Sequence, residues 1–99
     1  MKLREIAHSR TGDKGNSATI SVIVHREEDY PLVRDRITEE RVKAHFAGIV
    51  KGEVTRYEMP GIGALNFVLH DALAGGVTRS LSLDIHGKSL SSLLLEMEI

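Results

Sequence analysis

The stretch Arg10-Thr11-Gly12-Asp13-Lys14-Gly15-Asn16 separates two segments of alternating apolar and polar residues, and it decides how the chain begins to fold. The alternation is imperfect over residues 3–8 and clearer over residues 18–25, where β-branched residues dominate. Glycine adopts positive φ at no steric cost, so we expect a tight loop with Gly12 or Gly15 in that conformation. The pattern predicts two strands paired as an antiparallel hairpin.

The same loop is a candidate binding site for an anion. Backbone N–H groups that converge in a glycine-rich loop can hold an anion, here with help from Lys14, while Asp13 would fix the loop. A hairpin turn without a ligand explains the pattern equally well. The candidate ligand-binding residues are Gly12, Asp13, Lys14, Gly15, Asn16 and, as a second cation, Lys88.

Composition excludes several classes of protein. Ninety-nine residues predict one domain over 1–99 with a modest core. A net charge of −1 and an aromatic content of 4% argue against nucleic-acid binding. The absence of cysteine excludes disulfides and thiolate metal sites. No apolar run exceeds three residues and no signal-peptide pattern opens the chain, so we expect a cytoplasmic protein without a membrane segment.

Two short helices and a third strand should follow the hairpin. Pro31 suits the first helical position, and Thr38 before two glutamates is typical of a second helix N-terminus. Val42, Phe46 and Ile49 would form the apolar side of that second helix. Residues 53–59 alternate again and predict a strand.

Residues 63–73 place apolar side chains on one helical stripe and predict a further helix of about three turns. Asn66 and His70 are four residues apart, so they would share a face of this helix. They are either solvated or directed into a pocket. A fourth strand over 79–84 and a short C-terminal helix within 90–99 complete the predicted order.

The predicted fold is therefore α+β, a two-layer sandwich with helices on one face of a mainly antiparallel sheet. Its element order is β-β-α-β-α-β, followed by a C-terminal helix or strand. Residues that could line a pocket at one end of this sheet are Asn66, His70, Asp84 and His86.

The motifs of common catalytic and metal sites are absent. Residues 86–89 resemble the end of a phosphate-binding P-loop, but Ser82 stands where that motif requires glycine. The five histidines lack metal-ligand spacing, so we predict no metal and no cofactor. No catalytic residue can be assigned, and we expect no turnover by the chain alone.

Six motifs together resemble one family over essentially the whole chain. They are the 10–16 stretch, Arg41-Val42-Lys43-Ala44-His45-Phe46, Gly52-Glu53-Val54 with Arg56-Tyr57, Gly63-Ala64-Leu65-Asn66-Phe67, Gly75-Gly76-Val77-Thr78-Arg79-Ser80-Leu81, and Asp84 with Gly87-Lys88. This combination resembles the ferredoxin-fold domain at the C-terminus of acyclic terpene utilisation protein A, the AtuA-like family. Because the first crossover is only a loop, we expect a variant of the ferredoxin-like fold.

The resemblance implies a domain connected with breakdown of acyclic terpenes or branched acyl-CoA compounds. The resemblance is to a stand-alone version, so we expect that protein's large N-terminal domain to be encoded separately. Its expected partner is a separately encoded large subunit or a second copy of itself, and its expected ligand is an acyl-CoA or another anion. The alternative is a structural or oligomerisation module that binds no ligand.

Overall fold

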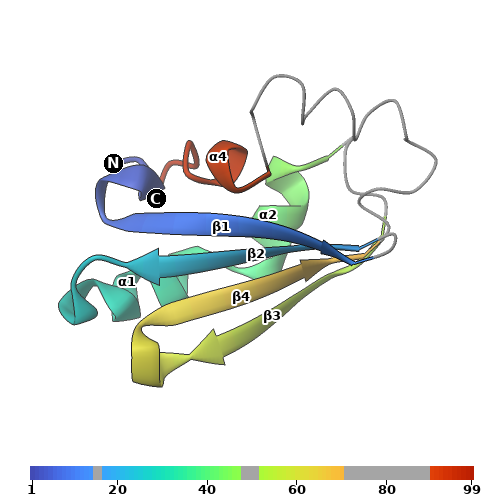
Figure 1. The fold of residues 1–99 in the computed structure, drawn as a ribbon. Coiled ribbons are helices and arrows are strands. Elements are labelled where there is room, and N and C mark those ends of the chain that lie inside the picture. The colour runs from blue at the N-terminus through green and yellow to red at the C-terminus, as the bar shows by residue number, and fades with distance from the viewer. Residues whose placement is uncertain (15–16, 48–51, 71–89) are drawn as a thin grey trace.

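The computed structural model describes residues 1–14, 17–47, 52–70 and 90–99 (Figure 1). The strands are β1 Ala7–Lys14, β2 Ser17–Val24, β3 Val54–Met59 and β4 Ala64–Leu69. The helices are α1 Tyr30–Arg36, α2 Glu39–His45 and α4 Leu90–Leu94, with 3-10 turns at Leu3–Glu5, Glu27–Asp29 and Pro60–Ile62. The strands form one antiparallel sheet in the order β1-β2-β4-β3.

This architecture confirms the predicted α+β class with a mainly antiparallel sheet. The run β2, α1 and α2, β3, β4, α4 follows the β-α-β-β-α order of a ferredoxin-like fold. β1 precedes that run and pairs with the side of β2 that β4 leaves open. The chain is therefore a ferredoxin-like variant that opens with a hairpin, as expected from its short first connection.

The hairpin is longer than the sequence predicts. β1 and β2 pair without interruption from Ala7 opposite Val24 to Lys14 opposite Ser17, so residues 10–14 belong to a strand. The expectation of positive φ is wrong for Gly12, which lies within β1, while Gly15 lies outside the described residues. Residues 3–5, expected to be part of the strand, form a 3-10 turn instead.

Both predicted helix starts in the middle of the chain are confirmed. Pro31 lies in the first turn of α1, where its missing N–H costs nothing. The hydroxyl of Thr38 accepts a hydrogen bond from the backbone N–H of Arg41 at 3.2 Å and so caps α2. Val42 and Phe46 are buried as predicted, while Ile49 lies outside the described residues.

The predicted helix over residues 63–73 is wrong, because residues 64–69 form strand β4 between β2 and β3. Leu65, Phe67 and Leu69 are fully buried while the residues between them are only partly buried. A helical stripe through Leu65 and Leu69 would have left Phe67 off the buried side. The two neighbouring strands instead satisfy both edges of this segment. The predicted strand over 79–84 lies outside the described residues.

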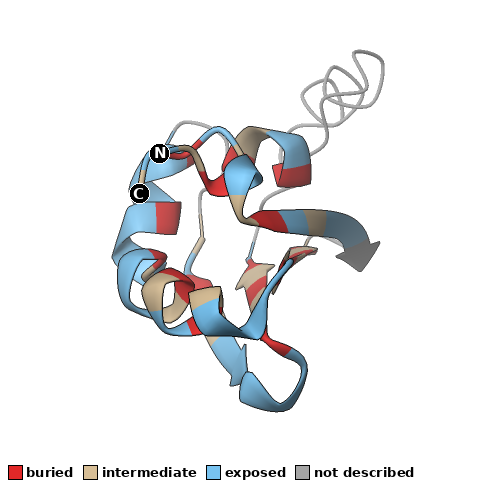
Figure 2. Cartoon of the chain, turned by 90° about the vertical axis from the view of Figure 1, so that its left-hand side faces the viewer, coloured by how far each residue is buried: buried red, intermediate tan, exposed pale blue. Residues whose placement is uncertain are grey.

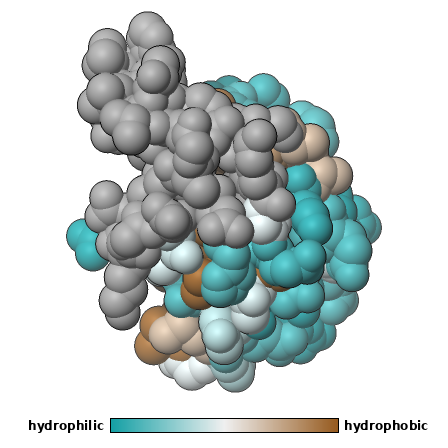
Figure 3. Space-filling model, turned by 90° about the vertical axis from the view of Figure 1, so that its right-hand side faces the viewer, coloured by the Kyte–Doolittle hydropathy of each residue, from teal (hydrophilic) through white to brown (hydrophobic). Residues whose placement is uncertain are grey.

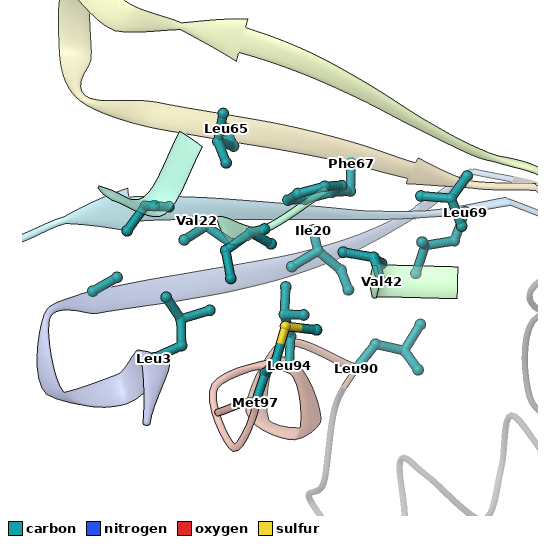
Figure 4. Close-up of a cluster of buried hydrophobic side chains, with 14 of the residues drawn as sticks. Leu3, Ile20, Val22, Val42, Leu65, Phe67, Leu69, Leu90, Leu94 and Met97 are labelled. Atoms are coloured by element: carbon teal, nitrogen blue, oxygen red, sulfur yellow. The ribbon is translucent and has the colours of Figure 1, made fainter. Parts of the chain in front are cut away.

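One hydrophobic core fills the space between the sheet and the helices (Figure 4). Buried positions alternate along β2 and β4 and recur on the inner sides of the helices (Figure 2). The central members are Ile20, Val22, Leu65, Phe67 and Leu69 from the sheet, with Val33, Val42, Phe46, Leu90 and Leu94 from the helices and their ends. Because they form one cluster, the described helices all cover the same face of the sheet.

The two ends of the chain lie side by side, as Figure 1 shows. Leu90–Leu94 forms the predicted C-terminal helix, and residues 95–99 run back along the N-terminus. The backbone N–H of Leu3 donates to the carbonyl of Met97 at 2.9 Å, and Lys2 forms a β-bridge with Glu98. Truncation of the last residues would therefore expose the first turn of the chain.

The turn before β4 requires glycine at one position. Gly63 has φ +63°, and a Cβ there would lie 2.9 Å from Cγ2 of Val24. We expect Gly63→Ala to lower the free energy of unfolding by about 1–3 kcal/mol, because a non-glycine residue is strained in this conformation. Gly61→Ala is the matched control, since a Cβ there meets no atom within 4 Å. Equal urea midpoints for the two variants would contradict this prediction.

Candidate functional site

The face of the sheet opposite the helices, called the outer face, carries most of the polar side chains of the central strands. Side chains alternate between the two faces of a strand, and β2 buries every second residue from Ala18 to Val24. The outer face follows from this alternation and the strand register. Its described residues are His8, Arg10, Gly12, Ser17, Thr19, Ser21, Ile23, His25, Thr55, Tyr57, Met59, Ala64, Asn66, Val68 and His70.

A row of polar side chains crosses this face at the middle of the sheet. Arg10 on β1 lies opposite Ser21 on β2, which lies opposite Asn66 on β4, and Tyr57 on β3 completes the row. The Ser21 hydroxyl donates to Oδ1 of Asn66 at 3.1 Å, which leaves the Asn66 amide N–H groups available. Arg10 is exposed and has no hydrogen-bond or ion-pair partner among the described residues.

The next rows lead toward the hairpin end. Gly12 lies opposite Thr19, and a Cβ on Gly12 would approach the Thr19 hydroxyl to 2.9 Å. On the same face, but on β3 and just after β4, the Thr55 hydroxyl and Nε2 of His70 are 3.3 Å apart. Beside the polar row, Gly12 therefore exposes backbone, the two threonines present hydroxyls, and His70 presents an imidazole.

The charge of the outer face has one sign. Among its described residues Arg10 is cationic, three are histidines and none is acidic. The rings of His8 and His25 stack at 5.4 Å. Glu53, which directly precedes β3, pairs with Lys43 of α2 at 3.3 Å. Among the described residues of this face, an anion would therefore meet no opposing carboxylate.

The comparison with protein families agrees with this fold. The family model described as AtuA ferredoxin-like domain matches residues 1–99. The chain belongs to the AtuA ferredoxin-like domain family. This confirms the resemblance drawn from the sequence motifs, and it suggests a role in acyclic terpene utilisation. No curated protein and no solved structure matches the chain.

The predicted site residues of this AtuA ferredoxin-like domain fall into three groups. Gly12, Asp13 and Lys14 lie in β1, opposite residues 19, 18 and 17 of β2. Asn66 and His70 do share a face, although on a strand rather than a helix, because residues four apart align under either periodicity. Outside the described residues lie Gly15, Asn16, Asp84, His86 and Lys88.

Sequence reasoning did not identify Arg10, Ser21, Thr19 and Thr55 as site residues of the domain. The alternation of Thr19 and Ser21 with buried residues indicated an exposed face of β2. Nothing in the sequence gave the register that places Ser21 between Arg10 and Asn66.

A hollow of about 330 Å³ lies on the opposite side of the domain, between α2 and the C-terminal segment. Its polar groups are already engaged, because Arg41 donates to the carbonyls of Arg36 and Glu98. His45 Nε2 lies 2.7 Å from the Leu93 carbonyl. These bonds join α2 to neighbouring backbone, so we interpret the hollow as a packing junction.

Two other site classes find no support in the part of the chain that the structure describes. No group of three or more His, Cys, Asp or Glu side chains there is placed to hold a metal ion. None of its helices is long and apolar enough to cross a membrane. Figure 3 shows a mainly hydrophilic surface around the described residues, with a small hydrophobic area at its lower rim.

Proposed function

We propose that this domain is an accessory subunit or domain of an enzyme of acyclic terpene or branched acyl-CoA catabolism. In this role it binds an anionic group, a carboxylate or the phosphates of a CoA ester, beside the hairpin of residues 12–16. Family membership supports the metabolic context. The observation that carries the binding proposal is Arg10, which has no partner among the described residues, beside the Ser21–Asn66 pair on a face whose described residues include no carboxylate.

The chemistry of the row suits a planar or tetrahedral oxyanion. A guanidinium presents paired N–H donors that match a carboxylate or phosphate. The Asn66 amide lies across β2 from Arg10, and the Thr19 hydroxyl lies one row toward the hairpin. Strand β1 continues past Arg10 and Gly12 to Lys14, and Gly15 and Asn16 follow in the sequence. We include Lys14 as a second cation because an acyl-CoA carries several phosphate charges.

The proposal assigns no catalytic residue to the domain. Histidine, hydroxyl and amide groups on an open sheet face lack the enclosed pocket in which general acids and bases usually act. We therefore propose that a partner, either a separately encoded large subunit or a second copy, completes any reaction site. Lys88 remains a candidate cation of the anion site, and the predicted pocket residues Asp84 and His86 remain candidates for the site completed by the partner.

The alternative function is a structural or oligomerisation module without a ligand. One observation favours it: β3 is an edge strand that carries exposed Tyr57 and Met59. Self-association through β3 and anion binding at Arg10 are compatible with each other, because β2 and β4 separate β3 from β1.

Charge removal on the outer face tests the binding proposal. We expect Arg10→Ala and Lys14→Ala each to weaken binding of isovaleryl-CoA by about 1–2 kcal/mol, the scale of one charge-assisted hydrogen bond. Isothermal titration calorimetry with the ester, with free CoA and with inorganic phosphate separates recognition of the acyl chain from that of the phosphates. Arg26→Ala is the control, because Arg26 is exposed and follows β2 outside the row.

Two results would count against it. If wild-type protein binds none of the three probes, the anion site does not exist in this chain alone. If Lys14→Ala or Arg10→Ala binds as tightly as Arg26→Ala, that residue takes no part in the site.

A further inference from the structure

Strand β3 has one hydrogen-bonding edge that no other described strand pairs with. It lies at the end of the sheet order and pairs only with β4 among the described strands. The backbone N–H of Arg56 donates to Oε2 of Glu39 at 2.8 Å, so it points away from β4. Because outward and inward residues alternate along an antiparallel strand, Val54 and Glu58 also direct their N–H and C=O groups outward.

The side chains on this edge are unusually apolar for a solvent-facing strand. Tyr57 is 53% exposed and Met59 is 41% exposed, and both lie on the outer face. Ile62, which is 62% exposed, follows in the next turn. An exposed strand edge beside large apolar side chains is a template for pairing with another chain.

We propose that two copies of this chain associate through β3, antiparallel, with Tyr57 of one copy opposite Tyr57 of the second copy. The inference goes beyond the proposed function, since it concerns self-association and does not involve the anion site. In this register Arg56 of each copy lies opposite Glu58 of the other. Thr55 lies opposite Met59.

The charges of β3 select this register. Centring the pair on Arg56 or on Glu58 would place like charges directly opposite each other, which is unfavourable. Centring it on Tyr57 pairs Arg56 with Glu58 twice, once on each side of the two-fold axis. Within one copy the same two side chains already attract, with Arg56 and Glu58 3.1 Å apart.

The backbone hydrogen bonds are compatible with this register. Arg56 and Glu58 both direct their N–H and C=O groups outward, so each pair of opposite residues can exchange two bonds. Tyr57 then occupies a position without mutual backbone bonds, where opposite side chains approach most closely. The two tyrosines and two methionines would cover the seam on the outer face.

Glu39 competes for this edge within the monomer. Its exposed carboxylate occupies the Arg56 N–H that pairing needs, so it must move into solvent when a second copy binds. Charged groups at strand edges protect proteins from uncontrolled pairing. Glu39 therefore weakens the association without abolishing it. A six-residue seam is also smaller than a standard stable interface, so we infer a dimer in exchange with monomers.

Disulfide trapping tests the register. Because the chain contains no cysteine, a disulfide can form only between the introduced residues. Opposite residues at positions without mutual bonds have Cα atoms about 4.5 Å apart, which is within the range of a disulfide. We expect Tyr57→Cys to form covalent dimers under oxidised glutathione at least about tenfold faster than Ile62→Cys. Thr55→Cys and Met59→Cys should cross-link to each other in a mixture faster than either does alone. Equal rates for Tyr57→Cys and Ile62→Cys would overturn the proposal.

Sedimentation equilibrium of cysteine-free variants provides a second measurement. We expect Glu58→Lys to raise the dimer Kd by about tenfold or more, because two attractive pairs become repulsive. Glu39→Ala should lower the Kd severalfold by freeing the edge. Glu27→Lys makes the same charge change away from β3 and should leave the Kd unchanged. A monomer at millimolar concentration in both wild type and Glu39→Ala would also refute the dimer, whatever the calorimetry of Arg10 shows.

Discussion

Phe67→Ala should lower the free energy of unfolding by about 3–5 kcal/mol, the largest effect expected of any single substitution considered. Phe67 is fully buried on β4, with β2 on one side and β3 on the other. It lies directly opposite Ile20 of β2, and both side chains belong to the core cluster (Figure 4). Truncation loses the transfer free energy of the ring and leaves a cavity that fixed strands on both sides cannot collapse.

Urea unfolding followed by circular dichroism measures this effect. Ile62→Ala is the control, since Ile62 is 62% exposed and its truncation should change stability by less than about 0.5–1 kcal/mol. A small domain has a total stability of only about 5–15 kcal/mol, so the Phe67 variant should lose much of it. A loss below about 1.5 kcal/mol would mean that β4 is not the packed centre of the sheet.

The elements that local chemistry specifies could be predicted from the sequence. β2 carries alternating β-branched residues, and its buried face emerged as predicted. Thr38 and Pro31 mark helix starts by mechanisms that act within one turn, and both are confirmed. The α+β class followed from the order of these elements. Signals of this kind need no knowledge of distant contacts.

β4 could not be identified in this way, because its sequence satisfies two periodicities. Leu65 and Leu69 align on a helix and on a strand alike, so only Phe67 and Val68 distinguish the two. The decision comes from tertiary structure: β2 and β3 each present an open edge, and a strand between them satisfies both. Local preference is commonly overridden when a segment completes a sheet.

The candidate site depends on register in the same manner. Asn66 and His70 were predicted to share a face, and the strand keeps them together. The neighbours that give Asn66 its chemistry, Ser21 and Arg10, come from strands 45 and more residues away in sequence. No pattern within one segment contains that information. The sequence therefore indicates which residues of each strand are polar and exposed, whereas the strand register determines which of these residues lie side by side.

Arg56→Met should lower the free energy of unfolding by about 2–3 kcal/mol and loosen the join between α1 and the sheet. The Arg56 guanidinium donates to the carbonyl of Ile37 at 2.9 Å and also to that of Arg34. These carbonyls belong to the end of α1, where backbone acceptors lack partners within the helix. The side chain is only 18% exposed, so water cannot fully replace it. A hydrogen bond that involves a charged group contributes about 1.5–3 kcal/mol. Water replaces part of the two lost bonds, so we expect a total loss near the lower end of their sum.

Methionine retains the aliphatic length of arginine, so the variant removes the donors while keeping most of the packing. Arg26→Met makes the same change at a side chain that is 76% exposed, and it should alter stability by less than about 0.5 kcal/mol. Hydrogen exchange localises the effect: amides of α1 should lose protection in Arg56→Met before those of β2 and β4, because only the helix loses its anchor. Equal stability of the two variants, or uniform loss of protection across the domain, would show that the guanidinium does not hold α1 against β3.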